Sequence, residues 1–63
     1  MKNQVMISLR ANRSQREIAE QLGISRTMYN AIENGKRSPS IKVMKKLIEF
    51  YGKPFEVLFF SNQ

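Results

Sequence analysis

The sequence predicts an all-α domain built from five short helices, and three observations lead to this fold class. Apolar residues recur at spacings of three and four positions in successive stretches of the chain, which is the period of a helix. A serine precedes three of these stretches, and its hydroxyl can accept a hydrogen bond from an N–H of the first turn. Glycine follows two of them, where a left-handed residue ends a helix. A chain of 63 residues is expected to form one domain, residues 1–63.

The first helix is expected over about residues 4–11. Val5 and Leu9 stand four positions apart with Met6 beside them, which makes one apolar helical face. Ile7 falls off this face, so a short strand is the open alternative for this segment.

The next two helices are expected at residues 15–22 and 26–33. Ser14 opens the first of them with the pattern S-x-x-E, a capping box, and Gly23 ends it. Ser25 opens the second. The apolar residues expected to face inward are Ile18, Ala19, Leu22, Met28, Tyr29 and Ile32. Because three residues separate the two helices, they must cross steeply, which predicts a helix-turn-helix motif at about residues 15–34.

The outward side of the helix at 26–33 carries short or hydrogen-bonding groups, namely Arg26, Thr27, Asn30 and Ala31. Arginine can pair with guanine, asparagine with adenine, and threonine or alanine can contact the thymine methyl group. We therefore expect these four residues to contact base edges in the major groove, the alternative being an ordinary polar face.

A loop follows at residues 34–40, indicated by its Asn-Gly and Ser-Pro pairs. Lys36 and Arg37 stand directly after the preceding helix, and we expect them to neutralise backbone phosphates. Asn34 either donates to a phosphate or caps the helix.

The last two helices are expected at residues 41–51 and 54–59. The apolar stripe of the longer one is expected to comprise Ile41, Met44, Leu47, Ile48 and Tyr51, with Lys42, Lys45, Lys46 and Glu49 outside. Pro54 suits the first position of the shorter one, whose buried side is expected to comprise Phe55, Leu58 and Phe59. The four phenylalanines between positions 50 and 60 either close the core against the first helix, or leave Phe59 or Phe60 exposed as a dimer contact.

The charge balance favours a polyanionic partner. Eleven Lys and Arg against five acidic residues give a net charge of +6 and a pI near 10.2. The alternative is a basic surface that merely keeps the protein soluble. Arg10, Arg13 and Arg16 follow one another at three-residue spacing and form either a solvated basic edge or one that faces phosphates.

Composition also argues against other classes of function. The chain has no cysteine and no histidine, so the usual metal ligands and the usual general base are missing. We expect no enzyme activity, no metal, no cofactor and no small-molecule ligand. No apolar run approaches the ~20 residues of a membrane span, and the first residues do not resemble a secretory signal. A cytoplasmic protein is expected.

The string SQREIAEQLGISRTMYNAIENGKRSPS, residues 14–40, resembles the Cro and lambda-repressor-like helix-turn-helix proteins, also called the xenobiotic-response-element family. The matching positions are Gln15, Ala19, Gly23, Ser25, Ile32, Glu33, Asn34, Gly35 and Pro39. The resemblance covers about residues 14–60. It implies a five-helix domain that binds operator DNA as a homodimer and inserts the second helix of the motif into each half-site.

The resemblance also implies roles for individual residues. Base contacts fall on Arg26, Thr27, Asn30 and, more weakly, Ala31, and phosphate contacts fall on Gln15, Asn34, Lys36 and Arg37. We add Arg16, which is next to Gln15, to the phosphate contacts. Arg10 is implied to pair with Glu33, although the connection before Gln15 is about two residues shorter than is usual in the family. Tyr29 stands where a β-branched aliphatic residue is commoner, and its ring is either wholly structural or directs its hydroxyl at a phosphate.

Together these observations predict a sequence-specific regulator that binds double-stranded DNA. We expect a small repressor of phage, plasmid or bacterial origin, associated with the nucleoid, which binds a palindromic operator as a homodimer. Its half-sites would lie ~34 Å apart. One alternative is an antitoxin-like protein-interaction module that uses Phe59 and Phe60 and binds DNA secondarily. Another is a non-specific basic nucleic-acid binder.

Overall fold

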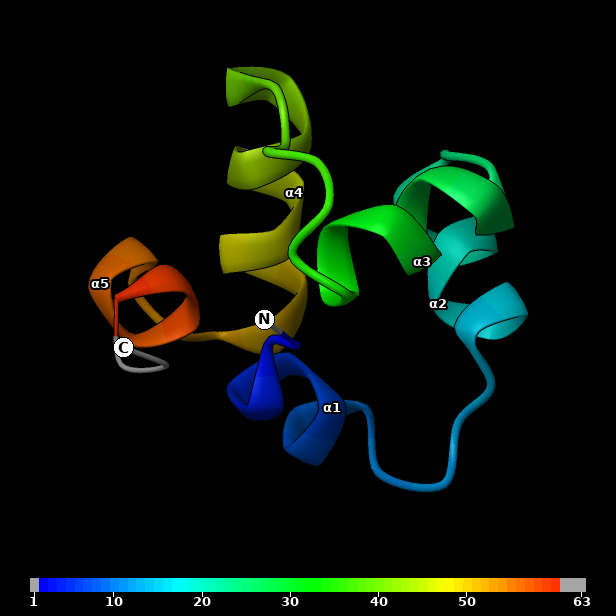
Figure 1. The fold of residues 1–63 in the computed structure, drawn as a ribbon, viewed down its shortest axis with the longest axis horizontal. Coiled ribbons are helices and arrows are strands. Elements are labelled where there is room, and N and C mark those ends of the chain that lie inside the picture. Colours follow the sequence, from blue (N-terminus) through cyan, green and yellow to red (C-terminus); the bar gives the residue numbers. More distant parts are fainter. Residues whose placement is uncertain (1, 61–63) are drawn as a thin grey trace.

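Helices account for all the regular structure in residues 2–60, which the computed structural model describes. Along this part of the chain they are α1 (Gln4–Arg10), α2 (Gln15–Leu22), α3 (Arg26–Glu33), α4 (Ile41–Tyr51) and α5 (Phe55–Phe59). Figure 1 shows α4 standing between α5 on one side and the α2–α3 pair on the other, with α1 below them. The all-α class and the order of the five helices are confirmed. None of these helices has the length and apolar character needed to cross a membrane.

Polar side chains begin four of the helices. Ser14, Ser25 and Ser40 each accept a hydrogen bond from the backbone N–H three residues later, as their spacing predicts. Asn3 caps α1 in the same way. This cap was not among those expected from the sequence, although asparagine is a strong N-cap residue. Pro54, expected as the first residue of α5, is instead its N-cap. Its ψ of 161° is extended, as is usual for an N-cap residue, whereas a first helical residue would need a helical ψ.

The connection between α1 and α2 turns sharply at Ala11. This residue has φ 55° and ψ −125°, so α1 ends one residue earlier than expected. Among the described residues it is the only one besides glycine with a positive φ. A side chain in such a conformation costs about 1–3 kcal/mol. The short connection is therefore made with local backbone strain.

The core lies where the five helices meet. Its buried apolar residues are Met6, Ile18, Ala19, Leu22, Tyr29, Ile32, Val43, Leu47 and Leu58. The inward face expected for α2 is confirmed completely, and that of α3 holds with Met28 only partly buried.

The expectation for the first turn of α4 is wrong. Ile41 is 73% exposed, whereas Val43, which the expected stripe omitted, is buried. Val43 and Leu47 are four residues apart and share the inward side, while Ile41 stands two positions before Val43 and so points to nearly the opposite side of the helix. Lys46, expected to lie outside, is half-buried because its Nζ donates to the backbone carbonyl of Leu22 at 3.0 Å.

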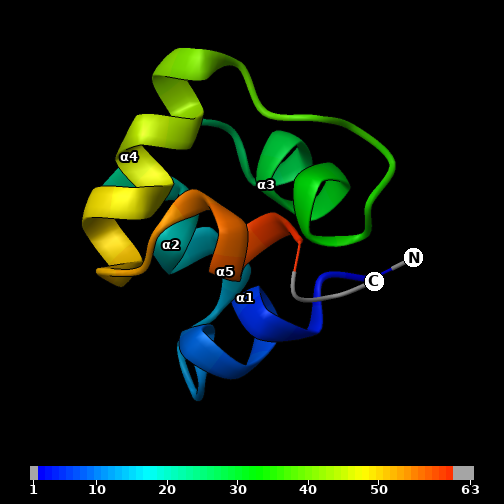
Figure 2. The ribbon, with the colours of Figure 1, turned by 90° about the vertical axis from the view of Figure 1, so that its left-hand side faces the viewer.

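The fifth helix packs against α1 and α4, as Figure 2 shows. Leu58 is fully buried, and the Nδ2 of Asn3 donates to its backbone carbonyl at 2.7 Å. Phe55 and Phe59 are partly buried, with ring centroids 5.2 Å apart, while Phe60 remains 55% exposed. Phe59 thus packs against the core, while the ring of Phe60 stays on the surface.

Candidate nucleic-acid interface

A tight turn sets the angle between α2 and α3. Gly23 has φ 71°, the left-handed conformation in which a side chain would be strained. The backbone N–H groups of Gly23 and Ile24 bond back to the carbonyls of Glu20 and Ala19. Ser25 then caps α3 immediately. The helix-turn-helix expected at residues 15–34 is present, and its two helices pack directly against each other.

The inner side of α3 is held by a buried pair of tyrosines. Tyr29 has no exposed surface, and its hydroxyl lies 2.6 Å from the hydroxyl of Tyr51 in α4. Burial raises the pKa of Tyr29, and the hydrogen bond to Tyr51 raises it further. Burial also raises the pKa of Tyr51. Tyr29 is therefore structural, because a fully buried hydroxyl cannot reach a phosphate in this conformation.

A bidentate ion pair joins the end of α3 to α1. Arg10 donates from Nε and Nη2 to the two carboxylate oxygens of Glu33, each at 2.9 Å, and Glu33 is only 2% exposed. Burial opposes ionisation of Glu33. The hydrogen bonds from Arg10, Gln15 and Tyr29 together outweigh it and hold the pKa of the carboxyl below its usual value of 4.5. The hydrogen bond with Glu33 in turn raises the pKa of Arg10. The pairing that the family resemblance implied is thus present.

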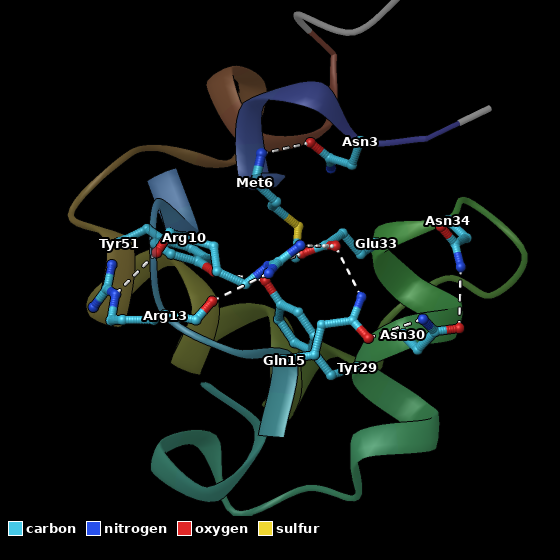
Figure 3. Close-up of polar contacts among 10 residues, drawn as sticks. All are labelled: Asn3, Met6, Arg10, Arg13, Gln15, Tyr29, Asn30, Glu33, Asn34 and Tyr51. Carbon is cyan, nitrogen blue, oxygen red and sulfur yellow. Dashed lines mark hydrogen bonds and ion pairs between the residues drawn. The ribbon is translucent and has the colours of Figure 1, made fainter. Parts of the chain in front are cut away.

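Three amide side chains continue from this ion pair toward the surface (Figure 3). Gln15 Nε2 donates to Glu33 Oε1 at 2.9 Å. Asn30 Nδ2 donates to Gln15 Oε1 at 2.9 Å, and Asn34 Nδ2 donates to Asn30 Oδ1 at 3.0 Å. We call Glu33, Gln15, Asn30 and Asn34 the amide relay. Each of these amides was expected to contact DNA, but their bonds to one another were not foreseen.

The outer side of α3 remains open. Arg26, Thr27 and Asn30 are exposed and line one shallow hollow, so the structure brings together three of the four residues expected to contact bases. Ala31, the fourth, is half-buried. Lys36 and Arg37 are exposed in the loop just beyond the end of α3.

A second hollow opens at the start of α2. Its lining consists of Arg10, Ser14, Gln15, Arg16 and Arg26. It combines guanidinium groups with the N-terminus of a helix, and both favour an anion. Of the residues expected to contact phosphates, Gln15 and Arg16 line this second hollow, which shares Arg26 with the hollow on α3.

The arginine series does not form a single edge. Arg10 is committed to Glu33. Arg13 donates to the carbonyls of Leu9 and Arg10 and lies 5.2 Å over the ring of Phe50. The even spacing misled because Arg10 and Arg13 meet different tertiary neighbours, Glu33 and Phe50.

Comparison with known proteins agrees with this geometry. A family model described as "Helix-turn-helix" matches residues 7–58. The chain belongs to this helix-turn-helix family. It is thus a DNA-binding regulator of the Cro and lambda-repressor type and not an enzyme.

Two relatives are similar in sequence. The chain is 42% identical over 48 residues to a protein of Methanocaldococcus jannaschii named an uncharacterized HTH-type transcriptional regulator, across 76% of this chain and 73% of that protein. It is 38% identical over 45 residues to the cryptic phage CTXphi transcriptional repressor RstR of Vibrio cholerae, across 71% of this chain but only 40% of the repressor. No solved structure matches the chain.

Proposed function

We propose that this protein is a transcriptional repressor that binds a palindromic operator as a homodimer and reads each half-site with α3. One observation carries the proposal. Arg26, Thr27 and Asn30 stand together on the exposed side of α3, while Tyr29 and Glu33 fix its opposite side in the core. A rigid helix that presents arginine, threonine and asparagine suits the major groove, because each can form a base-specific contact there.

The proposed contacts divide into two groups. Base contacts are assigned to Arg26, Thr27, Asn30 and, more weakly, Ala31, and phosphate contacts to Gln15, Arg16, Asn34, Lys36 and Arg37. The hollow at the start of α2 and the exposed loop after α3 support this division, because both carry cationic side chains. Phosphate contacts fix the position of α3 along the groove, and base contacts then supply the sequence preference.

The homodimer is supported by the exposed aromatic surface at the end of α5. Phe60 is 55% exposed, and its ring centroid lies 5.1 Å from that of Phe55. We assign Phe59 and Phe60 to a contact between two copies of the chain. For a two-fold dimer of this kind, we expect half-sites about one helical turn, ~34 Å, apart.

Repression is supported by the name of one relative, a phage transcriptional repressor. Occlusion of polymerase at the operator is the simplest mechanism, and it rests on analogy with the family. The protein would act in the cytoplasm, on the nucleoid.

Selection from a randomised duplex library at physiological salt tests the proposal. Enrichment of an inverted repeat with half-sites about one turn apart is the expected result. Enrichment of a single half-site would keep the role of α3 and remove the homodimer. Binding without any enriched sequence would leave a non-specific basic binder, and no binding at all would point to an antitoxin-like module that uses Phe59 and Phe60 for a protein partner.

A further inference from the structure

The amide relay has a fixed direction, and its buried end decides it. Glu33 Oε1 accepts from Arg10 Nη2 and from Gln15 Nε2, each at 2.9 Å. An ionised carboxylate can only accept hydrogen bonds. Gln15 must therefore turn its NH2 group toward Glu33, because the opposite orientation would set two acceptors against each other.

This constraint passes from one amide to the next. With its nitrogen directed at Glu33, Gln15 offers its oxygen to Asn30, so Asn30 must turn its nitrogen toward α2. The oxygen of Asn30 then faces Asn34, which donates to it. Each amide along the relay has one favourable orientation, although an exposed amide by itself adopts two that differ by a half-turn.

We propose that Glu33 and Gln15 are positioning residues that fix the order in which Asn30 presents its donor and its acceptor to a base pair. The inference rests on the proposed role of α3 in reading bases. Within the relay, the NH2 group of Asn30 still has one free hydrogen and its oxygen one free lone pair. Adenine requires one donor and one acceptor in a set order at N7 and N6. A half-turn of the amide would reverse that order.

The relay also explains why an exposed asparagine is held at both of its polar atoms. Asn30 lies on the surface of α3, where a solvated amide would rotate freely, yet its nitrogen and its oxygen both have protein partners. A side chain that is ordered before binding loses less entropy when it meets its target. Figure 3 shows the succession of groups from Glu33 through Gln15 to Asn30 and Asn34.

Gln15→Met tests the relay in the free protein. Methionine keeps the length of the side chain but removes both amide groups, and it leaves the pair between Arg10 and Glu33 in place. Gln21→Met is the matched control, because Gln21 is exposed on the same helix and lies outside the relay. By NMR, we expect Gln15→Met to shift the side-chain amide signals of Asn30 toward those of a solvated asparagine and Gln21→Met to leave them unchanged. Identical Asn30 signals in wild type and Gln15→Met would overturn the inference.

Base preference tests the consequence on DNA. Asn30→Ala identifies the base pair that Asn30 contacts. Loss of the asparagine should lower the ratio of affinities for the preferred and the wrong base at that position by roughly 5- to 150-fold, the range of a bidentate contact. Gln15→Met should lower the same affinity ratio by at least about fivefold on that scale. The double variant, Gln15→Met with Asn30→Ala, should have an affinity ratio no lower than that of Asn30→Ala alone.

Two other outcomes separate this inference from the proposed function. If Gln15→Met weakens binding equally on every sequence and keeps the base preference, Gln15 only contacts a phosphate and the positioning role is wrong. If the wild-type protein selects no sequence, the proposed function fails and the positioning role fails with it. In that case the NMR comparison still shows whether the relay orders Asn30 in the free protein.

Discussion

The two sides of α3 use their polar groups in different ways. On the inner side, Tyr29 and Glu33 are buried, and their hydrogen-bonding groups are satisfied by Tyr51, Arg10 and Gln15. On the outer side, Arg26 and Thr27 face an open hollow. A helix that reads bases needs a buried, hydrogen-bonded inner side and an open outer side. Without contacts that fix its inner side in the core, it cannot place its outer side chains with the accuracy that base contacts require. The difference separates variants that unfold the protein from variants that change what it binds.

The largest expected effect is on the inner side. Arg10→Met leaves the buried carboxylate of Glu33 without its cation, and breaking a buried pair in this way costs about 3–5 kcal/mol of unfolding free energy. Urea denaturation followed by circular dichroism measures it. Arg16→Met, an exposed arginine nearby, should stay within about 0.5 kcal/mol of wild type. Equal stability of the two variants would contradict a structural role for the ion pair.

Acid should weaken the same side of the helix. Because the pKa of Glu33 is lower in the folded protein than its usual 4.5, the ion pair contributes stability above that value, and this contribution disappears as pH falls through the folded pKa. Thermal unfolding between pH 7 and pH 2 should therefore show a falling midpoint below about pH 4.5. Glu33→Gln should be less stable at neutral pH and show a flatter profile. A wild-type profile as flat as that of Glu33→Gln would show that Glu33 contributes no such linkage.

On the outer side, the expected change is in binding. Arg26→Ala should cost about 1–3 kcal/mol of binding free energy with the preferred base pair at one operator position and should relax the preference there. Unfolding free energy should remain close to that of wild type, because Arg26 is exposed. Competition binding with operators substituted at single positions gives the measurement. Uniform weakening on every sequence would make Arg26 a phosphate contact instead.

The smallest effect returns to the inner side. Tyr29→Phe removes one hydroxyl of the tyrosine pair and should cost about 1 kcal/mol of unfolding free energy, the net value of one hydrogen bond. Operator affinity should stay the same after correction for the folded fraction. Tyr51→Phe is the natural counterpart, and because the two residues share one hydrogen bond, the double variant should lose less than the sum of the two. Strict additivity would mean that the two hydroxyls do not interact.

Sequence alone predicts the parts of this molecule that depend on neighbours along the chain. Three local features are confirmed: the serines that cap α2, α3 and α4, the glycines that end α2 and α4, and the apolar face of α2. Ile41 and Val43 were assigned wrongly because α4 carries apolar residues on more than one side, and only packing selects among them. The positive φ of Ala11 could not be predicted from the sequence, because alanine rarely adopts this conformation.

The candidate site divides in the same way. The exposed positions of Arg26, Thr27 and Asn30 follow from helical periodicity. The partner of Arg10 came from resemblance to a family, and no local pattern of the chain indicates it. The bond between Gln15 and Asn30 depends on the angle between α2 and α3, which a residue pattern does not specify. The bond between Asn30 and Asn34 spans four residues of one helical turn and was within reach of sequence reasoning.

Asn3 has a consequence for how the protein is made. Its backbone N–H bonds to the carbonyl of Glu33, and its side chain bonds to the carbonyl of Leu58, 55 residues away along the chain. During synthesis, α1 emerges early, but the hydrogen bond from Asn3 to Leu58 cannot form until α5 has left the ribosome. Contacts between such distant residues form slowly, because a long loop must close first. The bond between Asn3 and Leu58 therefore joins α1 to α5 only after both helices have been translated.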